Sequence, residues 1–244
     1  MVVDDRSDRL VLAPGAGPGE WWTRVIQVVR GTWRVLVPLA VLTLCLPLLV
    51  FQLVVPVDAP WVGPGAVLLL GLCVALGWSA CAFAMTRWAA ALPHGVGMSL
   101  RYGWWRLGRV WLWTVLALVV VGLGLALLVV PGLLAAFALC MTLPVASFER
   151  AGPLGRSWTL VRREKAAVLA RLGPLVAGFV AVAVLLSVLG LPGVGVVALA
   201  APLLFAGLLV TYAQLRGGEL PVRAVTLAAE LESPRLIVAS PPRS

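Results

Sequence analysis

Six long apolar runs separated by short connections limit this chain to few folds. The runs cover residues 35–57, 65–86, 110–130, 132–148, 172–191 and 193–215. Each is close to the roughly 17 to 25 residues that a helix needs to cross the core of a bilayer. All 19 Lys and Arg residues lie before the first run, after the last, or in the second and fourth connections. Because Lys and Arg are retained on the cytoplasmic side, we predict an all-α integral membrane protein with six transmembrane helices and both termini in the cytoplasm.

Composition supports a membrane protein independently. The chain is 61% hydrophobic and 12% charged, with a mean hydropathy of +1.03, which the surface of a soluble globule does not accommodate. Its net charge of +9 also suits nucleic acid, but the basic residues flank spans and form no soluble patch. We therefore expect anionic membrane lipids as partners, each surface cation contributing about 1 kcal/mol, and no nucleic acid. The excess of Arg over Lys and the abundance of Ala, Val, Gly and Leu predict a GC-rich bacterial source, and hence the bacterial plasma membrane.

The chain has a repeating organisation. The three outer connections carry Pro64-Gly65, Pro131-Gly132 and Pro192-Gly193. Proline presets the first central position of a tight turn and glycine supplies a positive φ at the second, so these pairs predict three helical hairpins. The pattern reflects either duplication of one unit or the ordinary alternation of basic connections with short turns.

A segment with helical periodicity precedes each hairpin on the cytoplasmic side. Basic, Trp-bearing amphipathic helices lie in the membrane interface, so we expect three interfacial helices. Their apolar faces are Trp22, Val25, Ile26, Val29 and Trp33; Leu100, Trp104, Leu107 and Trp111; and Leu154, Trp158 and Val161. Their basic faces predict a surface for lipid or a partner protein, made of Arg24, Arg30, Arg34, Arg101, Arg106, Arg109, Arg156 and Arg163.

The predicted domain organisation is a six-span membrane domain between two flexible ends. Residues 1–19 form a flexible N-terminal segment, residues 20–216 the membrane domain, and residues 217–244 a flexible cytoplasmic tail with room for a short helix near residues 225–231. Asp4, Asp5 and Asp8 near the start disfavour a cleavable signal peptide. All four cysteines lie inside spans, where a reduced thiol packs as a small apolar group.

The sequence offers no catalytic constellation. The six runs contain no Asp, Glu, His, Lys or Arg between their ends, although an intramembrane carboxylate or histidine is the usual sign of a proton-coupled path. His94 is the only histidine, and a lone loop histidine supports neither a zinc site nor a Ser/His/Asp triad. A phosphate-binding loop of the Walker type is also lacking. We therefore expect no enzymatic activity, no catalytic or metal residues and no cofactor.

One stretch carries a motif that is more specific than an apolar composition alone. From Pro131 the chain reads PGLLAAFALCMTLPVASFERAGPLGRSWTLVR. It resembles the membrane domain attached to some bacterial glycerophosphoryl diester phosphodiesterases and related stand-alone multispan proteins of unknown function. The resemblance is best over residues 96–190, and the matched positions are Pro131, Gly132, Pro144, Glu149, Gly152, Arg156, Ser157 and Trp158. Since this chain lacks a soluble phosphodiesterase domain, the resemblance implies a fold and not a reaction.

The end of this motif predicts a structural anchor. Glu149 lies where a span meets the inner surface and can pair with Arg150 or Arg156, which would fix the angle at which the next helix leaves the span. A ligand contact is the alternative.

The sequence is compatible with two functions. The first is a non-enzymatic scaffold or accessory subunit that contacts anionic lipid or a cytoplasmic or membrane protein partner. The second is a permease-like subunit or translocator for a lipid or small solute. A cavity lined by Gln52, Thr142 or Gln214 would favour the second.

Overall fold

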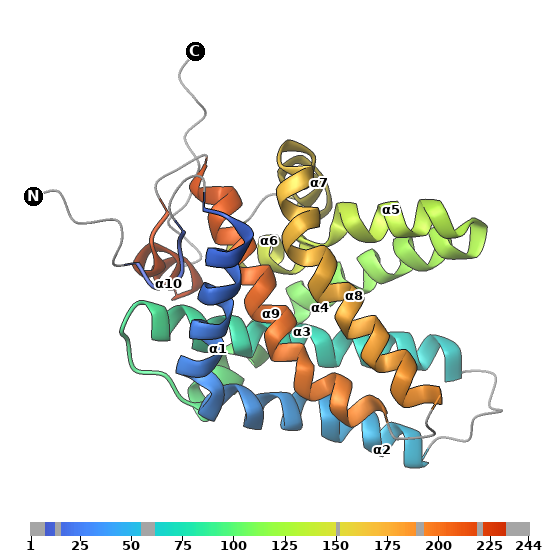
Figure 1. The fold of residues 1–244 in the computed structure, drawn as a ribbon. Coiled ribbons are helices and arrows are strands. Elements are labelled where there is room, and N and C mark those ends of the chain that lie inside the picture. Colours follow the sequence, from blue (N-terminus) through green and yellow to red (C-terminus); the bar gives the residue numbers. More distant parts are fainter. Residues whose placement is uncertain are drawn as a thin grey trace, which may run out of the picture.

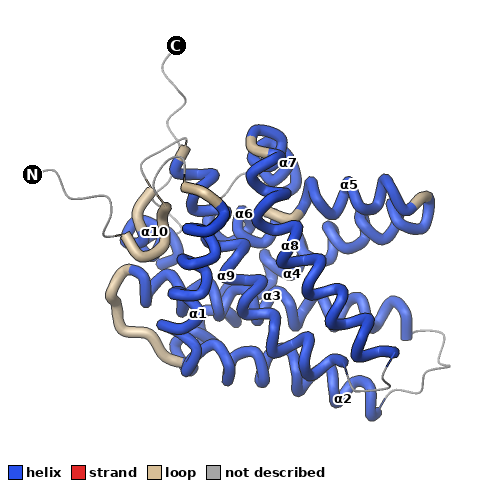
Figure 2. Tube along the Cα trace, viewed as in Figure 1, coloured by secondary structure: helices blue, strands red, loops and turns tan. Residues whose placement is uncertain are grey.

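The computed structural model describes residues 8–12, 16–54, 62–149, 152–188, 193–218 and 222–232, and these residues form helices and short connections without a strand (Figures 1 and 2). In chain order the elements are α1 (Pro18–Ala40), the π-helical segment η2 (Val41–Cys45), α2 (Leu46–Val54), α3 (Val62–Ala89), α4 (Val96–Leu127), α5 (Val129–Leu139), α6 (Thr142–Phe148), α7 (Pro153–Arg163), α8 (Lys165–Val188), α9 (Gly193–Gly217) and α10 (Ala224–Glu232). The prediction of an all-helical protein is confirmed.

Five helical stretches of the described chain are long and apolar enough to cross a membrane. They are Pro18–Phe51, Gly65–Ala89, Val96–Leu127, Val129–Phe148 and Lys165–Leu185. The sixth predicted run lies in α9, whose side chains are described only from residue 200 onward. α3 is the most buried of the five stretches and α4 the least. By length and composition these are the helices of a multispan membrane protein, and in the bundle α3 is central while α4 is mostly exposed.

Two of the predicted interfacial segments are continuous with the spans that follow them. α1 runs without interruption through the first segment, and α4 runs from Val96 to Leu127 through the second. A helix propagates until a residue breaks it, and residues 96–127 contain no proline. Pro38 lies inside α1, where it lacks the amide that would bond the carbonyl of Arg34, and the ribbon changes direction along this part of the chain (Figure 1). Only the third segment is a helix of its own, α7.

Two of the three Pro-Gly pairs lie inside helices and do not form the turns that the sequence predicts. Pro131 and Gly132 lie in the first turn of α5, and the chain reverses at Leu128, whose backbone is extended (φ −159°, ψ 143°). Pro64-Gly65 likewise lies in the first turn of α3, while Pro192 falls outside the described residues. Proline suits the first turn of a helix because its missing amide would have no partner there. These two Pro-Gly pairs therefore begin helices.

Gly132 is needed for close packing of α4 against α5. A Cβ on Gly132 would lie 2.5 Å from the backbone nitrogen of Leu125, and one on Gly124 would lie 2.9 Å from the Cα of Gly132. Glycines at such crossings let two helix backbones approach, as they do in many membrane helix pairs. The hairpin tip beyond them is exposed, with Leu127 79% accessible.

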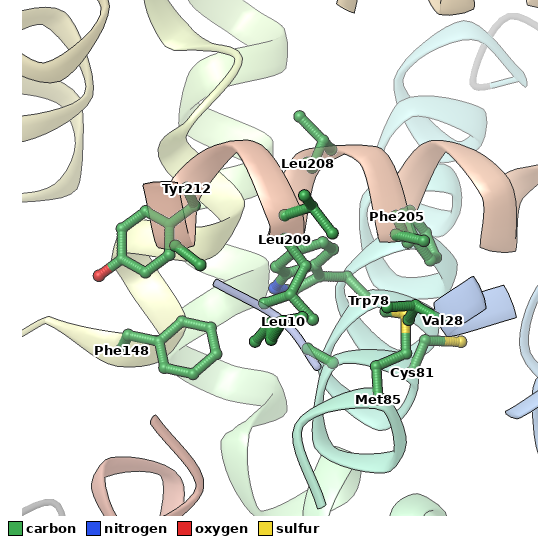
Figure 3. Packing of buried hydrophobic residues seen from close by; sticks show 14 of the residues in the cluster. Leu10, Val28, Trp78, Cys81, Met85, Phe148, Phe205, Leu208, Leu209 and Tyr212 are labelled. Carbon is green, nitrogen blue, oxygen red and sulfur yellow. The ribbon is translucent and has the colours of Figure 1, made fainter. Parts of the chain in front are cut away.

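The core lies where α1, α3 and α9 meet (Figure 3). Trp78 of α3 packs edge-on against Phe205 of α9 at 5.6 Å between ring centroids, and its indole donates a hydrogen bond to Ser147 Oγ at 2.8 Å. Trp21 of α1 is buried and donates to Thr211 Oγ1 of α9 at 3.1 Å. Buried tryptophans whose N–H groups are satisfied thus connect α1, α3, α6 and α9.

The described parts of both terminal segments, which composition predicts to be flexible, pack onto the bundle. Leu10 is buried, and α10 buries Leu227 and Leu231, largely against α3. Asp8 connects the two ends, because one of its carboxylate oxygens accepts the backbone N–H of Ala224 at the start of α10, at 2.8 Å. A side-chain acceptor at this position satisfies one of the free amides of a helix N-terminus.

The ends of the helices separate into two groups in Figure 1. The end of α2, the start of α3, the α4–α5 turn, the end of α8 and the start of α9 lie toward the right of the view. The start of α1, the α3–α4 loop, α7 and α10 lie toward the left and top. The first group borders the three connections that lack Lys and Arg, and the second borders the segments that carry them.

Candidate functional site

A network of charged and phenolic side chains joins the ends of α6, α7, α9 and α10. We call Glu149, Arg156, Tyr212, Arg216 and Glu230 the Glu149 cluster. One carboxylate oxygen of Glu149 accepts from Arg156 Nε at 2.9 Å, and the other accepts from the hydroxyl of Tyr212 at 2.9 Å. Arg216 donates to the same hydroxyl at 3.4 Å and pairs with both carboxylate oxygens of Glu230, one of them at 2.8 Å. The cluster thus alternates acids and arginines around a phenol.

Local structure places Glu149 at this junction. α6 ends at Phe148, whose ring stacks on Tyr212 at 5.3 Å between centroids, and Glu149 follows in extended conformation. Its backbone carbonyl accepts a hydrogen bond from Arg109 of α4. The helix end therefore has its backbone and both carboxylate oxygens satisfied by three other helices.

Of the predicted motif anchors, Glu149, Arg156 and Ser157 make internal contacts and Trp158 is half exposed. Ser157 is buried and donates from its hydroxyl to the carbonyl of Ala138, near the end of α5, at 2.8 Å. This carbonyl lies where α5 ends before α6, so Ser157 supplies a partner for a helix C-terminus. The buried face of α7 consists of Pro153, Ser157, Leu160 and Val161. The predicted apolar face is therefore rotated, because Trp158 is 50% accessible.

The charges of the cluster balance: Glu149 and Glu230 face Arg156 and Arg216. Burial lowers the pKa of Arg216. The hydrogen bond to Glu230 and the nearby Tyr212 and Glu149 raise this pKa by a larger amount, so the net shift is upward and Arg216 stays charged. Buried charges are tolerated only when paired and hydrogen-bonded, and removing one partner leaves the other uncompensated. Because both oxygens of Glu149 are engaged, this arrangement suits anchoring better than proton transfer.

The predicted basic surface divides into internal and exposed residues. Arg24 donates to the carbonyl of Asp8 at 2.7 Å, Arg106 contacts Tyr102 and α10, and Arg109 and Arg156 contact Glu149. The exposed members are Arg30, Arg34, Arg101 and Arg163. They lie on α1, α4 and α7 near exposed tryptophans.

A recurrent pattern escaped the sequence reasoning: an aromatic residue four positions before an arginine, on α3, α4 and α9. The pairs are Phe83–Arg87, Tyr102–Arg106 and Tyr212–Arg216, with each guanidinium carbon 5.3 to 6.0 Å from the ring centroid. Residues four apart share a helix face, so the spacing itself was the available signal.

Among the described residues, no group of three His, Cys, Asp or Glu side chains is placed to hold a metal ion. His94 lies in the α3–α4 loop with Nδ1 3.1 Å from the carbonyl oxygen of Leu92. The four cysteines, all within the described part of the chain, form no disulfide with one another.

Two apolar grooves lie on the helical surface. One of about 580 Å³ is lined by Val130, Leu133, Leu134 and Phe137 of α5 with Lys165, Ala166 and Leu169 of α8. Another, of about 310 Å³, lies between α8 and α9 beside Trp22. Neither is lined by Thr142 or Gln214, and the side chain of Gln52 falls outside the described part of the chain.

Comparison with protein-family models, with curated proteins and with solved structures gives no match.

Proposed function

We propose that this chain is a non-enzymatic protein of the bacterial plasma membrane with both termini in the cytoplasm, acting as a scaffold or accessory subunit whose basic face contacts anionic lipid. In this proposal the six apolar runs span the bilayer as three hairpins. The resemblance of residues 96–190 to the phosphodiesterase-associated membrane domain belongs to the same proposal and concerns the fold only.

The observation that carries the proposal is the pairing of exposed tryptophan with exposed arginine on α1 and α4. Trp33 is 54% accessible, and the guanidinium of Arg34 lies 5.8 Å from its ring centroid. On α4, Trp105 is 81% accessible and lies one turn beyond exposed Arg101. On α7, Trp158 and Arg163 are both exposed.

This chemistry suits the headgroup region of a bilayer. An exposed indole has an apolar body and a polar N–H, which favours the boundary between acyl chains and water, while nearby arginines attract anionic headgroups. In water, large exposed tryptophans on three helices would be an aggregation hazard. The grouping of these helices away from the connections that lack Lys and Arg supports placing them on one side of the membrane (Figure 1).

Lipid retention tests the proposal. The wild-type chain is extracted from bacterial membranes in mild detergent, and native mass spectrometry counts the bound phospholipids. We expect R30Q/R101Q to lose most of the retained anionic lipid, whereas the control R9Q/R223Q, which removes two exposed arginines outside the proposed surface, retains it. Retention that is equal in both variants, or a wild-type chain that binds neither anionic lipid nor a protein partner, would refute the proposal.

A further inference from the structure

Arg171 of α8 is a buried cation without an acidic partner. It is 8% accessible and donates to the carbonyl of Ala16, just before α1, at 3.2 Å. No carboxylate of the described chain lies within ion-pair distance of it, and Glu164, two helical turns earlier, is exposed. A guanidinium has five N–H donors, and burying a charge is costly unless it is paired. The surroundings of Arg171 therefore favour an anion.

The position of Arg171 within a span strengthens this expectation. The stretch Lys165–Leu185 is long and apolar enough to cross a membrane, and Arg171 lies in its second turn. Ionisable residues inside spans are rare and mark binding sites or ion paths. A position about 9 Å along the helix from Lys165 is close to the boundary between lipid headgroups and acyl chains.

An apolar groove begins one turn beyond Arg171 on the same helix. Pro174 and Leu175 line the groove of about 310 Å³ between α8 and α9, and residues three or four apart on a helix are neighbours. Leu175, like Arg171, is buried. The helices α1, α8 and α9 pack against one another here (Figure 1).

Printed contacts connect this end of the groove with the start of α1. A Cβ on Gly207 of α9 would lie 2.7 Å from Leu175 Cδ2 and 3.3 Å from the ring of Trp21. The ring of Trp21 packs edge-on against that of Trp22, which lines the groove, at 4.9 Å between centroids. Arg171 and Trp22 therefore flank the same end of the groove, and an indole there suits the boundary between headgroups and acyl chains.

The groove has the shape and chemistry of an acyl-chain site. Every residue that lines it is apolar, and its volume is within the roughly 300–1,000 Å³ of ligand pockets. Pro174, Gly178 and Val182 are exposed along its α8 wall, so it opens to the surrounding lipid. A Cβ on Gly178 would meet no atom within 4 Å, which leaves this wall open.

We propose that Arg171 and the α8–α9 groove bind one anionic phospholipid, with its phosphate at Arg171 and an acyl chain in the groove. A phosphodiester carries a single negative charge, which matches the charge of Arg171, and guanidinium binds phosphate with a planar fork of donors. The site rests on the membrane location in the proposed function. It adds a specific lipid position separate from exposed Arg30 and Arg101.

Native mass spectrometry of the full chain in mild detergent tests the site by titration with phosphatidylglycerol. R30Q/R101Q serves as the background, because it lacks two arginines of the basic face and reports lipid held elsewhere. We expect this background still to bind one phosphatidylglycerol, more tightly than phosphatidylcholine. Adding Arg171→Met should weaken the binding at least about tenfold, since a hydrogen bond to a charged group is lost. Gly178→Leu should also weaken it, by filling the groove.

Two controls match these substitutions. Gly122→Leu adds the same side chain at another open position, on α4, and Arg223→Met removes an exposed arginine elsewhere. Both should bind phosphatidylglycerol as the background does.

Unchanged binding in either Arg171→Met or Gly178→Leu would overturn the site, as would a background that binds no phosphatidylglycerol. Equal affinity for phosphatidylcholine would overturn the assignment of an anionic lipid, and displacement of the lipid by an equal concentration of inorganic phosphate would overturn the need for an acyl chain. The proposed function fails differently, because R30Q/R101Q would then retain as much lipid as the wild type.

Discussion

Replacing Gly132 by alanine should open the α4–α5 hairpin. The new Cβ would lie 2.5 Å from the backbone nitrogen of Leu125, closer than any unstrained contact, and a backbone atom cannot move aside as a side chain does. Overpacking costs about 1–3 kcal/mol, and contact with backbone places this substitution at the upper end. The higher helix propensity of alanine offsets about 1 kcal/mol of this loss in the free energy of unfolding. The net loss should be about 2 kcal/mol, or roughly thirtyfold in the unfolding equilibrium.

Gly122 provides the matched control on the same hairpin. A Cβ there meets no atom within 4 Å, so Gly122→Ala should stabilise the helix by up to about 1 kcal/mol. The free energy of unfolding is measured by titrating dodecyl sulfate into mixed micelles and following tryptophan fluorescence. Equal stabilities of the two variants would show that α4 and α5 do not approach closely at Gly132. Gly124→Ala, with its Cβ 2.9 Å from the Cα of Gly132, should destabilise in the same direction and combine non-additively with Gly132→Ala.

Three further substitutions test the packing around the Glu149 cluster and α1. Glu149→Gln should destabilise the chain in the same titration by about 3 kcal/mol at most, because partly buried Arg156 loses its charge partner. An unchanged midpoint of unfolding would contradict the anchoring role of Glu149. Ser157→Ala should cost about 1–3 kcal/mol by leaving a carbonyl without its donor, whereas exposed Thr159→Ala should change stability by less than about 0.5 kcal/mol. Gly31→Ala places a Cβ 2.1 Å from the ring of Trp88, so we expect a shift in Trp88 fluorescence and reduced thermal stability, and an unaltered spectrum would contradict this contact.

The long apolar runs made the helical class predictable. Hydrophobic length is a property of each segment alone. Five of the six runs overlap stretches that meet the requirement for a span, and the sixth lies in α9. The pairing of Glu149 with Arg156 was also within reach, since the two residues lie near each other in the sequence.

Features that depend on distant segments were not predictable. Pro131-Gly132 suits a turn and a helix start equally well, and only the backbone of α4 beside Gly132 shows what the glycine is for. Asp8 and Ala224 lie at opposite ends of the chain, so their hydrogen bond leaves no local signal. The same holds for Arg87 and Glu232, whose pairing places α10 against the bundle.

Orientation of the chain in the membrane is the central claim, since the basic face can meet the cytoplasmic leaflet in only one topology. Single cysteines are introduced as Asp58→Cys, in a predicted outer connection, and His94→Cys, in the α3–α4 loop. Intact cells are treated with a membrane-impermeant maleimide, and the wild-type chain gives the background from its own four cysteines. We predict labelling of Asp58→Cys in intact cells and of His94→Cys only after permeabilisation. The reverse pattern would contradict the account.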